Sequence, residues 1–238
     1  MQLSKKKVIV TGATRGIGKA IANAFCRGNY YVIGTSTTNV NASSTCCNEM
    51  FTVDFGDDKQ IEDCAAFVYE QKADILINNA GINKIAPFVE IEPKDFQLIQ
   101  KVNVFAPFRL CQAAVPAMRE NKWGRIINIS SIWGKISKEF RASYSASKFA
   151  LDGLTAALAI EHARDGIIAN CIAPGFTDTE LTRSVLGDEG INKIVELVPA
   201  RRMGTVEDIA NFVLWLCSEE NNYITGQNIA IDGGFTRA

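Results

Sequence analysis

The sequence predicts a single α/β domain, built as a doubly wound parallel sheet with helices on both faces. Strand-like apolar runs alternate with helical patterns along the whole chain, and a glycine-rich turn joins the first run to the first helical segment. Such alternation predicts βαβ units and a parallel sheet. No linker, internal repeat or low-complexity tract interrupts the pattern. We therefore expect one domain over residues 1–238.

The individual elements follow from the same pattern in chain order. Short apolar runs predict strands at 7–11, 30–35, 50–53, 74–78, 125–130, 167–173 and 227–231. Helical periodicity predicts helices at 17–27, 59–71, 93–120, 143–164 and 206–218. The polar stretch 174–199 follows the sixth strand, and we expect a mobile substrate lid at about 177–199, because mobile covers are drawn from such segments.

Composition excludes several classes of function. With 47% hydrophobic and 21% charged residues, the chain has enough apolar residues for a large core. Its net charge of −1 gives no overall positive potential that would attract nucleic acid. No apolar stretch reaches the roughly 18 residues that a membrane span needs, and no signal peptide is visible, so we expect a cytoplasmic protein.

The cysteines and the single histidine predict no metal site. Seven cysteines without paired metal spacing indicate reduced thiols. The adjacent Cys46 and Cys47 lie in a polar loop, which leaves a reactive pair open, but we expect ordinary loop residues. A two-histidine metal motif is excluded. His162 leaves a serine hydrolase open only if that one residue serves as its base.

The glycine turn Gly12-x3-Gly16-x-Gly18 predicts a dinucleotide site. Glycines allow a tight turn and close approach to a pyrophosphate, and the following helix offers free N–H groups and a positive dipole end. The next strand ends in GTST with no acidic residue, so a 2′-phosphate is not repelled, and Arg15 supplies a positive charge. This pattern favours NADP(H). Asp54 either accepts from the adenine amino group or caps the following helix.

Ser131, Tyr144 and Lys148 predict a site that activates a carbonyl. Tyr144 and Lys148 are four residues apart on one expected helix, so they share a face. Ser131 follows an expected strand and can donate to a carbonyl oxygen. A tyrosine pKa is about 10 in isolation, and we expect Lys148 to stabilise the phenolate of Tyr144.

In these motifs the chain resembles the single-domain short-chain dehydrogenase/reductase family, which has a Rossmann-like fold. The resemblance rests on TGATRGIG at 11–18, NNAG at 78–81, Asn103, Ser131, Tyr144-x3-Lys148, Pro174-Gly175 and the terminal ITGQNIAIDGG. It covers essentially the whole chain. Within the family the glycine turn, GTST and GRIINISS are most similar to the bacterial β-ketoacyl-acyl-carrier-protein reductases, which act in fatty acid synthesis.

The resemblance implies roles for individual residues. It makes Ser131, Tyr144, Lys148 and Asn103 catalytic, with Lys148 bonded to the nicotinamide ribose and Asn103 holding a water that resupplies protons. Motif and resemblance together place NADP(H) against Gly12, Thr14, Arg15, Gly16, Ile17, Gly18, Ser36, Thr37, Asp54, Phe55, Asn79, Ala80, Gly81, Tyr144, Lys148, Pro174, Gly175, Thr177 and Thr179.

The substrate remains open at this stage. The resemblance implies NADPH-dependent reduction of a ketone carried on an acyl carrier protein, but INKIAPFVEIE at 82–92 is more like sugar, polyol or other small-carbonyl reductases. A non-catalytic NADP(H)-binding sensor is a distant alternative. Trp133 and residues 139–141 are expected to line the pocket. An acidic carrier needs basic residues nearby, with Arg119, Lys122, Arg125 and Arg164 as candidates.

Two expected helices carry apolar residues beyond one face, which indicates burial against another subunit. These residues are Phe105, Phe108, Leu151, Leu154 and Leu158. Apolar side chains that the sheet cannot cover indicate that the protein associates with another subunit. The family resemblance implies a homotetramer.

Overall fold

The computed structural model describes residues 5–238, apart from the side chains of residues 181, 185 and 186. Its sheet contains seven parallel strands in the order β3-β2-β1-β4-β5-β6-β7. The strands are β1 (Lys7–Val10), β2 (Tyr31–Ser36), β3 (Glu49–Thr52), β4 (Ile75–Asn78), β5 (Gly124–Ile129), β6 (Ile167–Pro174) and β7 (Asn228–Ile231). The predicted fold class is confirmed, and each predicted strand is present.

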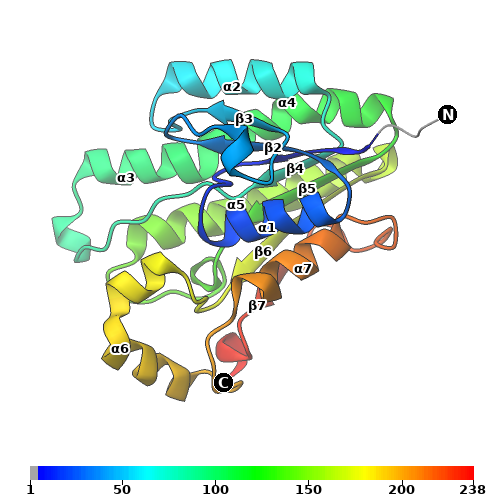
Figure 1. The fold of residues 1–238 in the computed structure, drawn as a ribbon. Helices are drawn as coiled ribbons and strands as arrows, with labels where there is room; N and C mark the ends of the chain where they lie inside the picture. The colour runs from blue at the N-terminus through cyan, green and yellow to red at the C-terminus, as the bar shows by residue number, and fades with distance from the viewer. Residues whose placement is uncertain (1–4) are drawn as a thin grey trace.

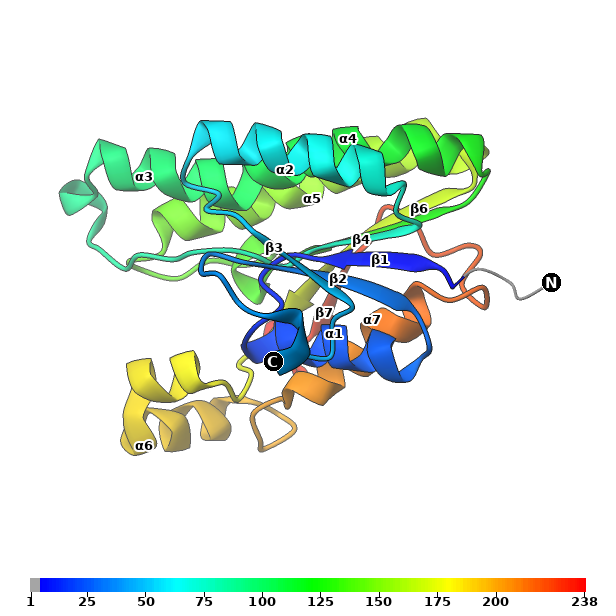
Figure 2. The same ribbon diagram turned by 45° about the horizontal axis from the view of Figure 1, so that its top comes forward.

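The helices cover both faces of this sheet. They are α1 (Gly16–Arg27), α2 (Asp58–Gln71), α3 (Pro93–Gln100), α4 (Ala106–Glu120), α5 (Ala142–His162), α6 (Glu180–Leu197) and α7 (Val206–Leu216). Figure 2 shows α2, α4 and α5 on one face and α1 and α7 on the other. Each layer encloses its own core: Ile9, Leu76 and Ile126 lie in one, and Val10, Ile77 and Ile127 in the other.

The two helical layers explain why the strands are apolar without interruption. Successive residues of a strand face opposite sides of the sheet, and both sides are covered by helices here. β4, β5 and β6 are buried at every position. The periodicity of a half-exposed strand is therefore missing, as expected for a parallel sheet in two helical layers.

Two elements differ from their sequence predictions. The expected helix at 93–120 consists of α3 and α4 joined by a π-helical turn at Lys101–Phe105. The polar stretch after β6 contains α6, a helix bent at Gly187, whose φ is +62°. α6 projects away from the sheet (Figure 1), so it lacks the wide apolar face by which a helix is recognised in sequence.

No helix among residues 5–238 is long and apolar enough to cross a membrane. Within the same residues, no group of histidine, cysteine, aspartate or glutamate side chains is arranged to hold a metal ion.

Candidate functional site

The predicted site residues gather where the parallel strands end. β1 leads into the glycine turn, β4 into Asn79, β5 into Ser131, and β6 into Gly175. The first turn of α5 brings Tyr144 to the same edge. Ligands of open parallel sheets bind outside these carboxyl ends. The topology thus assembles residues that are more than 160 positions apart in the sequence into one region.

The glycine turn is shaped by close packing as well as by backbone conformation. Gly12 and Gly16 have φ of +66° and +52°, a region that favours glycine. A Cβ on Gly18 would lie 2.2 Å from the Gly12 carbonyl oxygen and 2.3 Å from Asn79 Nδ2. Asn79 Nδ2 in turn donates to the Thr11 and Gly12 carbonyls at 2.9 and 3.3 Å. The Asn79 side chain therefore holds the backbone of the glycine turn in place through these two hydrogen bonds.

The N-terminus of α1 fits a bound anion. Arg15 occupies the cap position without a side-chain cap bond, and the first turn contains no acidic residue. N–H groups at a helix start need an acceptor, and a phosphate oxygen can supply it. Thr179 lies close by, because a Cβ on Gly16 would be 3.7 Å from Thr179 Cγ2. The structure thus brings the segment after β6 to the predicted pyrophosphate site.

The end of β2 carries the residues that the sequence predicts beside a 2′-phosphate. Thr35 and Ser36 are buried and Thr37 is exposed. Thr35 Oγ1 accepts from Gly12 N at 3.2 Å, so this strand end is tied to the glycine turn. Arg15 lies in the glycine turn and is exposed.

Of the two roles that the sequence left open for Asp54, the structure excludes one. The cap of α2 is Asp57, whose Oδ1 accepts from Gln60 N at 3.0 Å. Asp54 Oδ1 instead accepts from Gly56 N at 2.8 Å, and the residue is exposed. The alternative of Asp54 as the helix cap is therefore wrong. Phe55 is buried in the core.

Ser131 and Tyr144 form the centre of the predicted catalytic set. Ser131 is 8% exposed, and its Oγ accepts from Trp133 N at 3.2 Å. Burial raises the pKa of Tyr144 above 10.0, while a hydrogen bond with Ser131 and the charge of Arg141 oppose this rise. The phenol is consequently protonated at neutral pH. A protonated phenol beside a serine hydroxyl can donate a proton to a carbonyl oxygen.

Lys148 lies beside Tyr144 but is bonded elsewhere. Its Nζ lies 5.4 Å from the centroid of the Tyr144 ring and donates to the Ile129 carbonyl at 2.8 Å. Burial lowers the pKa of Lys148 to about 8. The groups that lower the pKa of Tyr144 in this structure are Ser131 and Arg141, and stabilisation of the phenolate by Lys148 stays a prediction.

Asn103 is a positioning residue in this structure. It is 1% exposed and lies in the π-helical turn between α3 and α4, a feature often found at functional sites. Its side-chain amide makes two hydrogen bonds with the backbone of Ile82: Nδ2 donates to the Ile82 carbonyl and Oδ1 accepts from the Ile82 N–H, each at 2.9 Å. Nδ2 also donates to Ser147 Oγ at 3.0 Å. Gly81 passes between Asn103 and Lys148. The amide thus fixes the loop beside Lys148, and its expected role in proton supply stays a prediction.

The segment after β6 continues the site. Pro174 is buried at the strand end, and Gly175 N donates to the Ile231 carbonyl at 2.9 Å. Thr177 is 5% exposed and its Oγ1 donates to the Gly175 carbonyl at 3.3 Å. Thr179 is the cap of α6 and accepts from Thr182 N.

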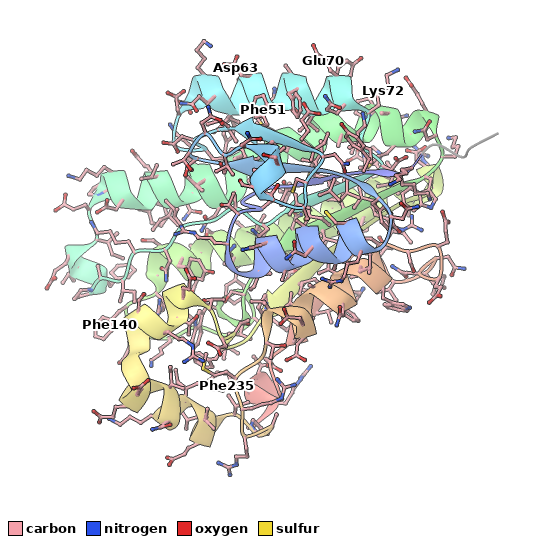
Figure 3. The ribbon with its side chains drawn as sticks, in the orientation of Figure 1. Phe51, Asp63, Glu70, Lys72, Phe140 and Phe235 are labelled. Atoms are coloured by element: carbon pink, nitrogen blue, oxygen red, sulfur yellow. The ribbon has the colours of Figure 1, made fainter. Side chains whose placement is uncertain are left out.

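An aromatic cluster lies next to Ser131. Trp133 contacts Phe176 and Phe235 with ring centroids 6.1 and 6.3 Å apart, and Phe176 and Phe235 are 5.1 Å apart. Figure 3 shows Phe235 in the half of the molecule that carries α6. The sequence predicted Trp133 as a pocket residue but missed Phe176 and Phe235. Phe235 lies near the chain end, over 100 residues from Trp133, so no local pattern could reveal this contact.

The predicted carrier-docking residues lie at the wrong edge of the sheet. Arg125 opens β5, whereas Ser131 follows its far end. Arg125 is also buried, and its guanidinium donates to backbone carbonyls, including Asn221 O at 3.0 Å. Arg119 and Lys122 both pair with Asp165, just before β6. Arg164 lies in the same turn as Asp165, so all four candidates lie at the opposite end of the strands from Tyr144.

The histidine-dependent hydrolase is likewise excluded by position. His162 Nδ1 lies 3.1 Å from Asp165 Oδ2 at the end of α5. Tyr144 lies at the beginning of the same helix, about 27 Å away along its axis. Ser131 is at the Tyr144 end, so His162 cannot act on it.

Comparisons with known proteins find relatives that match almost the whole chain. A family model described as enoyl-(acyl carrier protein) reductase matches residues 12–236. The 3-oxoacyl-[acyl-carrier-protein] reductase of Buchnera aphidicola subsp. Schizaphis graminum is 36% identical over 242 residues, which cover 98% of each chain. The protein of that name from Escherichia coli strain K12 is 35% identical over 241 residues, again 98% of each chain.

Solved structures show the same fold with other named substrates. A gluconate 5-dehydrogenase from Burkholderia cenocepacia J2315, in complex with NADP and tartrate, has a TM-score of 0.89 and 28% identity, covering 99% of this chain and 97% of its own. A 4-hydroxyisoleucine dehydrogenase complexed with NADH has a TM-score of 0.91 and 32% identity, covering 98% of this chain and all of its own.

Proposed function

The chain belongs to the short-chain dehydrogenase/reductase family, and we propose that it is an NADPH-dependent reductase of a ketone to a secondary alcohol. The observation that carries the proposal is the meeting of Ser131, Tyr144 and Lys148 beside a glycine turn with an uncapped helix start. The cofactor would lie along the carboxyl edge, from the end of β2 past the glycine turn to the segment after β6, and supplies the hydride when bound.

The residues of the chain handle the oxygen and the proton. Ser131 donates a hydrogen bond to the substrate carbonyl and stabilises the charge that grows there. Tyr144, protonated because burial raises its pKa, gives its proton to the same oxygen. Lys148 has a pKa of about 8, so its ammonium can return a proton to Tyr144 near neutral pH. Asn103 holds the Ile82 loop in place against this pair.

The substrate we propose is a 3-oxoacyl group on an acyl carrier protein. Support comes from relatives of that name, which match almost the entire chain at 35–36% identity. The aromatic cluster of Trp133, Phe176 and Phe235 offers an apolar wall for an acyl chain. The second candidate is a dehydrogenase of sugar acids or other small carbonyl compounds. The solved structures favour it. Arg141 favours it too, because this arginine is half-buried and has no acidic partner among residues 5–238, so it can bind a substrate carboxylate.

The experiment is a comparison of carbonyl substrates by NADPH oxidation. A 3-oxoacyl carrier thioester, a free 3-oxoacyl thioester and oxidised sugar acids are offered at equal concentration. The highest kcat/KM with the carrier thioester supports the first candidate, and preference for a sugar acid supports the second. Binding of NADPH without turnover of any carbonyl would instead indicate a sensor and overturn the reductase proposal.

We also propose a homotetramer that acts in the cytoplasm. Phe105 and Phe108, at the start of α4, are 42% and 40% exposed with ring centroids 6.4 Å apart. Phe149 on α5 is 46% exposed, so two helices present apolar side chains to solvent. Leu151, which the sequence placed in this surface, is buried instead. A monomer by light scattering would contradict the proposed assembly.

A further inference from the structure

Three cysteines cluster near the end of α1 that lies opposite the glycine turn, away from the catalytic set. Cys26 lies in the last turn of α1, and Cys46 and Cys47 lie in the loop 37–48 between β2 and β3. Cys26 Sγ lies 2.6 Å from Cys46 Sγ, although the residues are 20 positions apart in the chain. A disulfide has a sulfur–sulfur distance of 2.03–2.05 Å. Bond formation therefore requires a movement of well under 1 Å.

Exposure distinguishes this pair from the other thiols. Cys46 is exposed and Cys26 is half-buried, whereas Cys47 is only 6% exposed. The other four cysteines are buried, and burial raises the pKa of each thiol; they are Cys64, Cys111, Cys171 and Cys217. Thiol–disulfide exchange needs a thiolate that the reagent can reach. Cys46 is the thiol that a reagent can reach, and Cys26 is the thiol next to it. Burial and the contact with Cys46 raise the pKa of Cys26 as well.

We propose that Cys26 and Cys46 are an oxidisable site that forms a reversible disulfide with a low-molecular-weight disulfide as oxidant. The Cys46 thiolate attacks one sulfur of the reagent, which forms a mixed disulfide and releases one small thiolate. Cys26 then attacks the Cys46 sulfur, which forms the Cys26–Cys46 bond and releases the second small thiolate. The two cysteines lose two electrons and two protons, and the reagent becomes two thiols.

The bond would link α1 to the loop that begins at the proposed 2′-phosphate site. Ser36 and Thr37 open this loop, and its far end is tied to β2 because Asn48 Oδ1 accepts from Val32 N at 2.8 Å. Cys47 also packs against β2, since a Cβ on Gly34 would be 3.0 Å from Cys47 Sγ. We therefore expect oxidation to change the KM for NADPH and to leave kcat unchanged. Ser131 and Tyr144 lie on other elements.

The test treats the full-length protein with oxidised glutathione and analyses it without reduction. The expected product is lighter by two hydrogen atoms, gives a Cys26–Cys46 peptide, and returns to the starting mass with dithiothreitol. A crosslink that closes a loop of this length should raise the midpoint of thermal unfolding by about 6–12 °C. Cys26→Ser and Cys46→Ser should abolish both changes, and the matched variant Cys47→Ser should retain them.

Three results would overturn the proposal. They are a stable glutathione adduct as the final product, a Cys46–Cys47 crosslink, and no loss of hydrogen with excess reagent. The mass and the unfolding midpoint do not depend on enzymatic activity. A failure of the disulfide proposal can therefore be distinguished from a failure of the proposed reductase function.

Discussion

Replacement of Gly18 by alanine tests how the glycine turn is built. The new methyl group would lie 2.2 Å from the Gly12 carbonyl oxygen and 2.3 Å from Asn79 Nδ2, so both must move. Overpacking costs about 1–3 kcal/mol. Displacement of Asn79 also weakens its bonds to Thr11 and Gly12, at about 1 kcal/mol each. We expect the free energy of unfolding to fall by about 3–5 kcal/mol.

Urea unfolding and NADPH titration by fluorescence measure the two consequences. NADPH should bind more weakly to Gly18→Ala, because the displaced turn no longer offers its N–H groups to the phosphates. Gly153→Ala is the matched control, since Gly153 lies exposed on α5 with no atom within 4 Å of its added Cβ. It should gain about 0.5–1 kcal/mol in stability. Equal stability and NADPH affinity in the two variants would refute this account of the turn.

Three further predictions concern charge at the site. Arg15→Ala should raise the KM for NADPH about 10- to 100-fold and leave that for NADH unchanged, because a charged hydrogen bond to the 2′-phosphate is lost; Arg27→Ala, exposed at the other end of α1, should change neither. The kcat/KM for ketone reduction should be level below pH 8 and fall above it, because Lys148 with its pKa of about 8 loses the proton it supplies; a level profile through pH 9 would contradict this. Arg141→Gln should raise the pKa of Tyr144, since the Arg141 charge lowers it, and should move the pH profile of alcohol oxidation to higher pH; a profile that stays in place would disprove this coupling.

Much of the fold and the site followed from local sequence patterns. Each strand of the sheet is a short apolar run, and the predicted turn Gly12–Gly18 and the Tyr144–Lys148 spacing depend on neighbours within seven residues. Such features are readable because their geometry is fixed by the helix period or by backbone conformation. Ser131 could be placed because the carboxyl ends of parallel strands meet at one edge of the sheet.

Features that depend on distant partners could not be predicted. Arg125 was expected on the surface, but its guanidinium stacks on Trp123 at 4.3 Å and donates to backbone carbonyls from other segments. The Cys26–Cys46 contact joins a helix end to a loop of polar residues with no periodic pattern. α6 was missed because it lies off the sheet and contains Gly187. For Arg125 and for the Cys26–Cys46 contact, the determining neighbour is remote in the sequence.

The central claim is that Tyr144 supplies the proton in a hydride reduction, and Tyr144→Phe tests it most directly. This change removes one hydroxyl and keeps the ring, and Tyr223→Phe, 93% exposed, is the matched control. With the best carbonyl substrate, we predict that kcat/KM falls about 10²- to 10⁴-fold while the Kd for NADPH stays within about threefold, a free-energy change under 1 kcal/mol. Wild-type turnover by Tyr144→Phe with NADPH binding intact would contradict the account.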